Sequence, residues 1–138
     1  MKNILFIMAD QLRYDYLSCA GHLTLETPNI DALANLGVQF SQAYVQSPVC
    51  GPSRMCTYTG RYVSTHGATW NYVPLPLSEM TIGDHLRPLG TDVLLVGKSH
   101  VTPNFEGIRR LGIDPETEVG QLLVQGGFRI FERDDGIH

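Results

Sequence analysis

The sequence predicts an α/β fold with a mostly parallel sheet flanked by helices. The continuous apolar run Ile4–Ala9 has the pattern of a strand covered on both faces, and Asp92–Val96 is a second candidate for a buried strand. Helical patterns with recognisable ends lie between them, the clearest after Thr27-Pro28. Strands that alternate with helices along a chain favour a parallel sheet over separate α and β regions.

Size and composition set further limits on what the chain does. Its 138 residues, 43% hydrophobic and 17% charged, are typical of one soluble globular domain. Lys and Arg number 10 against 14 Asp and Glu, a net charge of −4, and no run of like charges occurs. We therefore expect no nucleic-acid partner and no membrane partner.

The first residues and the cysteines point to a compartment. The N-terminal apolar run is too short to span a bilayer and lacks a small-residue cleavage site. Cys19, Cys50 and Cys56 make an odd count without a Cys-x-x-Cys pair, which favours neither a disulfide framework nor a cysteine-rich zinc site. The simplest prediction is a reducing, cytoplasmic location.

The first third of the chain contains two predicted strands and a helix. Ile4–Ala9 is predicted as a buried strand, although periodicity alone also allows a buried helical segment. Thr27 offers an N-cap before Pro28, and the helix that follows is expected to stop at Gly37. Val38–Val45 is predicted as a short strand.

Helix signals continue through the centre of the chain. Pro52-Ser53 is expected to open a helix that runs to Gly60, with Cys50 at or just before its N-terminus. A further helical face begins at Ser78 and closes at Gly90, and Pro88 is expected to tighten it or end it early.

The C-terminal third is predicted to contain strands and a polar turn. Asp92–Val96 leads directly into the segment GKSH, and Phe128–Phe131 is another candidate strand. The segment from Glu132 to Gly136 is then expected to be a polar turn, with Asp134-Asp135 in a solvated surface loop.

Reactive side chains gather where the predicted strands and one helix end or begin. Ligands of open α/β sheets bind beyond the carboxyl ends of the strands. Asp10-Gln11 follows the first strand, Cys50–Arg54 precedes a helix, and Lys98 with His100 follows a later strand. Carboxylate and amide oxygens suit a hard cation, although an isolated Asp-Gln pair is more often a plain strand end.

The remaining candidates suit the chemistry of an anion. A thiol at a helix start feels the positive end of the helix dipole, and Arg54 can bind a tetrahedral oxyanion. Lys98 adds a point charge, and His100 can donate or accept a proton. Taken singly, Cys50 can also be a small buried hydrophobe and the charged residues can be surface groups.

The spacing of these residues resembles the sulfatase family of the alkaline phosphatase superfamily. The segment CGPSR at Cys50–Arg54 matches the family signature Cys-x-Pro-Ser-Arg. Thr59-Gly60-Arg61, the opening FIMADQ and the segment GKSH follow the order and similar spacings of the family. The resemblance implies an alkaline phosphatase-like fold, with residues 1–138 as the N-terminal portion of a catalytic domain and its C-terminal remainder absent.

The resemblance also implies a modified nucleophile and a metal. In sulfatases the signature cysteine is oxidised by a formylglycine-generating enzyme, and the hydrated aldehyde attacks sulfur and later releases sulfate. By this analogy Asp10, Gln11 and modified Cys50 are metal ligands, and Arg54 holds the hydrate. The metal is expected to be Ca²⁺, with Mg²⁺ or Mn²⁺ as alternatives.

Further roles follow from the same resemblance. Lys98 is expected to bind sulfate oxygens, and His100 to hydrogen-bond the hydroxyl that is deprotonated during sulfate release. Asn71 falls near a substrate-facing position. Gln11, where many sulfatases have an aspartate, resembles choline-sulfatase-like and phosphonate monoester hydrolase-like members, whereas Lys98 and His100 favour a small-molecule sulfate ester over a phosphonate.

Three functions are compatible with these residues. The first is a metal-dependent sulfuric ester hydrolase. This chain alone is expected to be largely inactive, because the family's remaining metal ligands lie downstream of the region represented here. The second keeps the machinery but acts on phosphonate monoesters or phosphodiesters. The third is a non-catalytic truncated remnant that serves as a binding or assembly module and self-associates through exposed apolar surface.

Overall fold

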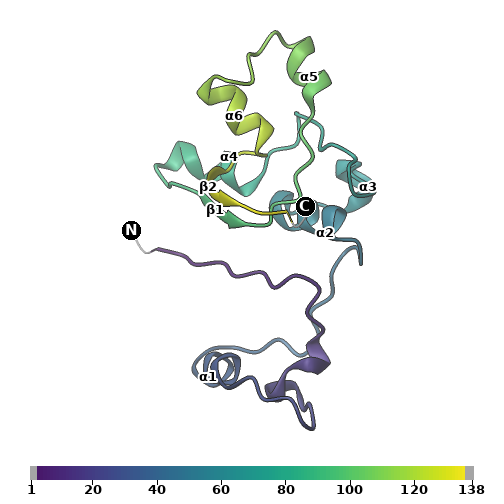
Figure 1. The fold of residues 1–138 in the computed structure, drawn as a ribbon, viewed down its shortest axis with the longest axis vertical. Helices are drawn as coiled ribbons and strands as arrows, with labels where there is room; N and C mark the ends of the chain where they lie inside the picture. The colour runs from purple at the N-terminus through teal and green to yellow at the C-terminus, as the bar shows by residue number, and fades with distance from the viewer. Residues whose placement is uncertain (1–2, 136–138) are drawn as a thin grey trace. The chain divides into compact units, whose positions relative to one another are not determined.

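The chain forms two compact units, Met1–Tyr44 and Val45–His138. A computed structural model describes residues 3–135, and Figure 1 follows them as a ribbon. None of the helices in that described range has the length and apolarity that a membrane span requires.

The first unit is built around one helix and two short turns of 3₁₀ helix. These are η1 (Tyr14–Tyr16), η2 (Ser18–Ala20) and α1 (Pro28–Leu36). Helix α1 begins after Thr27 and ends before Gly37, so the predicted helix is confirmed. The Thr27 hydroxyl does not cap the helix; it donates to Asp31 at 3.0 Å, and Asp31 also accepts the hydroxyl of Ser18 at 2.6 Å.

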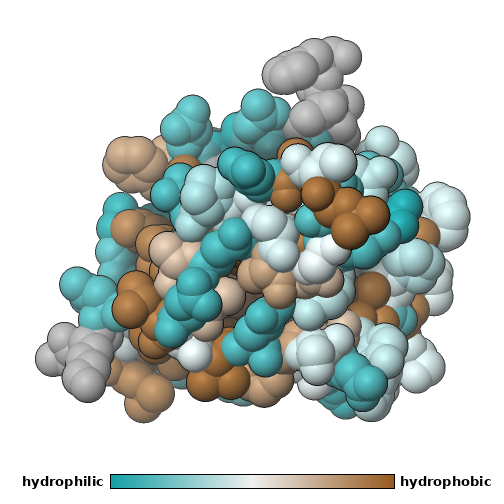
Figure 2. All heavy atoms as spheres, turned by 90° about the horizontal axis from the view of Figure 1, so that it is seen from below, coloured by the Kyte–Doolittle hydropathy of each residue, from teal (hydrophilic) through white to brown (hydrophobic). Residues whose placement is uncertain are grey.

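The two strands predicted in this part of the chain do not form. Ile4–Ala9 and Val38–Val45 contain no strand, and their apolar side chains are mostly exposed, Ile4 to 90%. Figure 2 shows brown hydrophobic side chains among hydrophilic ones on the face in view. A single apolar segment becomes a strand only when a neighbouring strand pairs its backbone groups, and the described residues of the first unit contain no such neighbour.

The second unit alternates helices with two strands. Its helices and strands are α2 (Cys50–Thr59), α3 (Val63–His66), α4 (Ile82–Leu86), η3 (Arg87–Leu89), β1 (Leu94–Gly97), α5 (Phe105–Arg110), α6 (Glu118–Val124) and β2 (Arg129–Arg133). The sequence patterns predicted α2, the α4–η3 segment and both strands. They did not predict α3, α5 or α6, which are short.

The ends of two predicted helices are explained by their caps. Helix α2 stops at Gly60, whose φ of 66° lies in the left-handed region that favours glycine. Helix α4 starts with a capping box, in which Thr81 accepts from the backbone of Gly83 and the Asp84 carboxylate accepts from the Thr81 N–H. The chain then tightens into η3, which contains Pro88, as expected from the missing N–H of proline.

The two strands pair in parallel, which confirms the predicted α/β class. Leu94 lies opposite Arg129 and Leu95 opposite Ile130, after which the register shifts by one residue. The crossover between the strands contains α5 and α6, and Figure 1 shows the strands side by side with α2 and α4 close to them. A parallel pair requires such a long connection, commonly a helical one.

One apolar core supports this unit. It consists of Met55, Tyr58, Ala68, Leu75, Val101 and Phe128. The rings of Tyr58 and Phe128 meet edge to face, with centroids 4.9 Å apart. Since Tyr58 lies on α2 and Phe128 directly precedes β2, the core fixes α2 against the sheet.

Candidate active site

Cys50 is the first residue of α2, as the sequence predicted. Val49 before it is extended, and the helix has ten residues including Cys50. The backbone N–H groups of the first turn give this end of the helix a partial positive charge, which favours a bound anion there. Cys50, Cys19 and Cys56 are all free thiols in the structure.

Asn71 lies directly against Cys50. Its side-chain oxygen accepts from the Gly51 N–H at 2.8 Å and lies 3.6 Å from the Cys50 sulfur, and its amide nitrogen lies 3.4 Å from the same sulfur. A Cβ on Gly51 would lie 2.6 Å from the Asn71 oxygen. Only glycine therefore lets Asn71 approach the helix terminus this closely.

Arg54 is buried one turn into α2, with 5% of its surface exposed. Its guanidinium donates to the backbone carbonyl oxygen of Lys98 at 2.7 Å. This contact joins the helix that begins at Cys50 to the loop that follows β1. The alternative that Arg54 is an ordinary surface charge is therefore wrong.

The loop after β1 is held over the same helix by further contacts. The Tyr58 hydroxyl donates to the Ser99 carbonyl oxygen at 3.3 Å. The rings of Tyr72 and His100 lie edge to face, with centroids 6.3 Å apart. Because Tyr72 directly follows Asn71, one short segment contacts both Cys50 and His100.

The structure corrects the prediction for Asp135. Asp134-Asp135 was expected in a solvated loop, but the Asp135 side chain is largely buried and accepts the backbone N–H groups of Ser99 and His100. Burial acts to raise the pKa of Asp135, but hydrogen bonds from Arg133, His100 and Ser99 outweigh it and lower that pKa to about 2. A sequence signal was available, since Asp135 follows the carboxyl end of a predicted strand.

A second cysteine lies deeper in the unit and is structural. The Cys56 sulfur lies 3.3 Å from Nε2 of buried His66, and Nδ1 of His66 accepts from the Ala68 N–H at 3.1 Å. Burial raises the pKa of the Cys56 thiol and lowers the pKa of the His66 imidazole. Both groups are therefore kept neutral, which suits a packed core rather than a nucleophile.

The two predicted metal ligands of the first unit are exposed. Asp10 and Gln11 follow the extended segment, and Gln11 has a φ of 55°. Their carboxylate and amide oxygens fit a hard cation chemically. Within residues 3–135, however, no three His, Cys, Asp or Glu side chains lie together as a metal site. The ligand set of Asp10, Gln11 and Cys50 stays a prediction.

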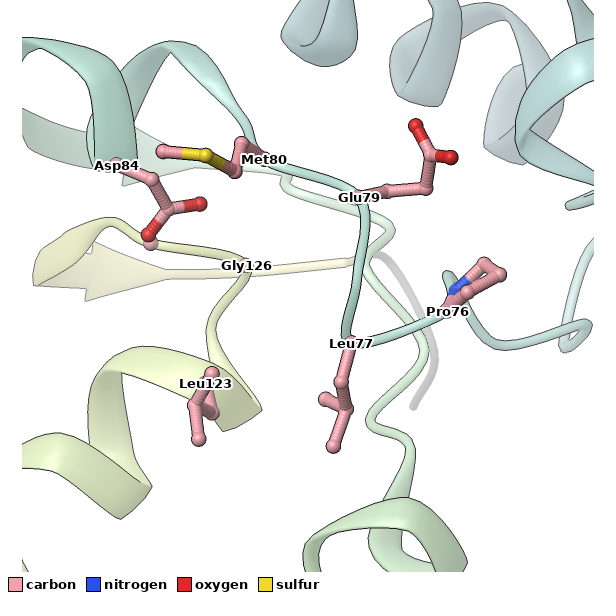
Figure 3. A pocket seen from close by; sticks show the side chains of 8 residues that line it. Pro76, Leu77, Glu79, Met80, Asp84, Leu123 and Gly126 are labelled. Carbon is pink, nitrogen blue, oxygen red and sulfur yellow. The ribbon is translucent and has the colours of Figure 1, made fainter.

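A pocket in the second unit lies apart from these residues. It is lined by Pro76, Leu77, Glu79, Met80, Asp84, Leu123, Gly126 and Gly127, most of them labelled in Figure 3. Its two carboxylates have structural partners, because Glu79 pairs with Arg61 and Asp84 closes the capping box of α4. None of the predicted site residues lines this pocket.

Comparisons with known proteins agree on one family. A family model described as Sulfatase matches residues 2–114. The ulvan-active sulfatase of Formosa agariphila is 39% identical over 102 aligned residues, and the match covers 73% of this chain and 20% of that protein. The multifunctional alkaline phosphatase superfamily protein PehA of Trinickia caryophylli is 36% identical, over 99% of this chain and 31% of that protein.

A solved structure agrees with these relatives. The phosphonate monoester hydrolase of Agrobacterium radiobacter superposes with a TM-score of 0.74 at 33% identity, and the match covers 91% of this chain and 24% of that one. The chain thus spans between a fifth and a third of the length of these relatives. The alkaline phosphatase-like fold that the signature residues implied is confirmed.

Proposed function

The chain belongs to the sulfatase family, and on this premise we propose that residues 1–138 form the N-terminal part of a sulfuric ester hydrolase. The observation that carries the proposal is the convergence of two segments distant in sequence. The N-terminus of α2, with Cys50, and the loop after β1, with Lys98 and His100, are joined through Arg54 and the Asn71–Tyr72 segment.

In this proposal Cys50 is the residue that matures to formylglycine, through a formylglycine-generating enzyme as partner. One hydroxyl of the hydrated aldehyde attacks sulfur as the alcohol of the ester leaves, and deprotonation of the second hydroxyl lets the hemiacetal collapse to the aldehyde and release sulfate. A divalent cation, Ca²⁺ or alternatively Mg²⁺ or Mn²⁺, would make the attacking hydroxyl more acidic when bound. Asn71 fixes the side chain at position 50 through two polar atoms. Asp10 and Gln11 are the oxygen donors of this chain toward the cation.

The charged residues act on the transferred group. Lys98 provides a positive charge for the sulfate oxygens. Buried Arg54, which lies one turn from Cys50 on α2, fixes the backbone of Lys98. His100 hydrogen-bonds the hydroxyl of the hydrate that is deprotonated during sulfate release. The partial positive charge at the start of α2 favours the same anion.

The choice of sulfate over phosphonate rests on the loop after β1. Lys98 and His100 are the residues that the sulfatase resemblance requires there, whereas Gln11 is compatible with either substrate class. The similar proteins include a sulfatase and a phosphonate monoester hydrolase. Parallel assays on an aryl sulfate and an aryl phosphonate separate the two, with the matured residues 1–138 in the context of the complete protein; we expect the sulfate to be preferred.

Exposed apolar side chains favour a second, non-catalytic role as an assembly module. Ile4, Leu5 and Phe6 are each more than two-thirds exposed, and such a contiguous run marks interaction surfaces. Self-association would cover it. Light scattering decides between the roles, because an assembly module is a homo-oligomer and a clean monomer contradicts it.

The direct test of the anion site is a titration of the isotope-labelled chain with sodium sulfate, followed by backbone amide shifts. We expect the shifts to concentrate at Gly51, Lys98 and His100, and Lys98→Ala to weaken sulfate binding by about tenfold. The matched control is Arg109→Ala, which removes an equal charge from the exposed side of α5. Equal losses in both variants would overturn the proposal.

A further inference from the structure

The loop that carries Lys98 and His100 is anchored by a carboxylate from a distant part of the chain. One oxygen of Asp135 accepts the Ser99 N–H at 2.8 Å and the His100 N–H at 3.0 Å. The same oxygen lies 3.4 Å from the Ser99 hydroxyl. Two successive backbone donors thus converge on one negative charge, an arrangement that fixes the path of a loop.

Asp135 is itself held by Arg133. The Arg133 Nε donates to the other Asp135 oxygen at 2.7 Å, and the same guanidinium reaches the carbonyl oxygen of Val101 at 3.0 Å and the side chain of Gln125 at 2.6 Å. The guanidinium therefore connects the end of β2, the end of the loop and the residue after α6. Its planar fork suits three partners in fixed directions.

Both charges are mostly removed from water, with side-chain exposures of 25% for Arg133 and 15% for Asp135. Hydrogen bonds to a charged group that is shielded from solvent are stronger than those at an open surface. The low pKa of Asp135, about 2, keeps its carboxylate ionised at neutral pH. The two N–H groups of the loop consequently have a constant acceptor.

The backbone of the loop needs such an acceptor. His100 has a φ of 55°, in the left-handed region that residues other than glycine seldom adopt. A non-glycine residue stays there only where surrounding contacts compensate for the strain. The carboxylate of Asp135 accepts the N–H of that same residue.

We propose that Asp135, held by Arg133, is a positioning residue that sets the orientation of Lys98 and His100. It acts through the backbone of Ser99 and His100 and does not touch the substrate. Its importance for turnover rests on the proposed function, because it matters for chemistry only if Lys98 and His100 act on sulfate. Its importance for the loop does not.

The loop is tested first, by hydrogen exchange and amide shifts of the full chain. In the unaltered protein the Ser99 and His100 amides should exchange slowly, and rapid exchange would overturn the proposal without any variant. Asp135→Asn should speed the exchange of both amides by roughly tenfold or more, since a charge-assisted acceptor is lost. Asp134→Asn, which removes the same charge from the exposed neighbour, should leave both amides unchanged.

Sulfate binding then links the loop to the site. With sodium sulfate as the probe, Asp135→Asn should raise the dissociation constant roughly tenfold while Asp134→Asn leaves it unchanged. A merely stabilising residue would shift the melting temperature but not the sulfate affinity of the folded protein. If the unaltered chain binds no sulfate, the proposed function fails; if it binds and both variants match it, the positioning role fails.

Discussion

The two units of the molecule are ordered by different means. Residues 45–138 enclose an apolar core that includes Met55, 2% exposed, and this core fixes α2 against the sheet. In residues 3–44 no side chain is buried, and order comes from local hydrogen bonds around Asp31. Burial supplies most folding free energy, so the second unit should be far more resistant to unfolding than the first.

The predicted site residues are divided between the unit with an apolar core and the unit without one. Cys50, Arg54, Asn71, Lys98 and His100 belong to the unit with a core, where packed elements hold them in defined contacts. Asp10 and Gln11 belong to the unit without one. We therefore expect the anion to be bound by residues 45–138. We expect this chain to bind a divalent cation more weakly than it binds the anion.

The largest expected effect comes from the core. Met55→Ala should reduce the free energy of unfolding by about 2–5 kcal/mol, through lost burial and the cavity that remains. Leu36→Ala in α1, where the side chain is 88% exposed, should change it by no more than about 0.5 kcal/mol. Urea denaturation measures both. Similar losses for the two variants would show that the units do not differ as described.

A smaller effect is expected where Asn71 meets α2. Gly51→Ala should cost about 1–3 kcal/mol, because its Cβ would clash with the Asn71 oxygen 2.6 Å away. In an Asn71→Ala background the same substitution should cost much less, and it can even stabilise the helix. Additive losses in this double-mutant cycle would mean that the contact is absent in solution.

Acid should weaken the second unit through His66. Burial lowers the pKa of His66 below its ordinary value of 6.5, so the unfolded chain takes up a proton that the folded chain refuses. The stability that neutral His66 contributes is complete above pH 6.5 and is lost as the pH falls toward the folded pKa. The melting temperature should therefore decline with acidification in this range, and His66→Gln should flatten the decline. An unchanged slope in the variant would assign it to other groups.

The smallest effect belongs to the first unit. The Ser18 hydroxyl, together with Thr27 and the Cys19 N–H, lowers the pKa of Asp31. Asp31→Ala should speed amide exchange in α1 and η2 and leave the melting transition of the second unit in place. A shift of that main transition would indicate that the two units unfold together.

Local signals in the sequence predicted α1, α2 and the α4–η3 segment, although not the short helices α3, α5 and α6. Pro28 and Gly37 bracket α1, and the segment from Cys50 to Gly60 contains the start and stop of α2. These features act within a few residues, so a pattern in the chain suffices to predict them. The convergence of α2 with the loop after β1 was also expected, because both contribute to one edge of a parallel sheet.

Features that depend on distant partners were predicted less well. Ile4–Ala9 has a strand pattern, but pairing decides whether a strand forms, and the pattern does not contain the partner. Asp135 was assigned to a surface loop because a polar neighbourhood in sequence resembles one. Its burial results from Ser99 and His100, more than thirty residues away. Both cases show tertiary contacts overriding local composition.

The most direct measurement is mass spectrometry of the Cys50 peptide after co-expression with a formylglycine-generating enzyme. Cys19 and Cys56 provide internal controls in the same chain. We expect that Cys50 alone exchanges its sulfur for an aldehyde oxygen, while the other two cysteines stay thiols. An intact Cys50 thiol, in cells that convert a known sulfatase, would contradict the assignment of α2 as the nucleophile-bearing helix of a sulfuric ester hydrolase.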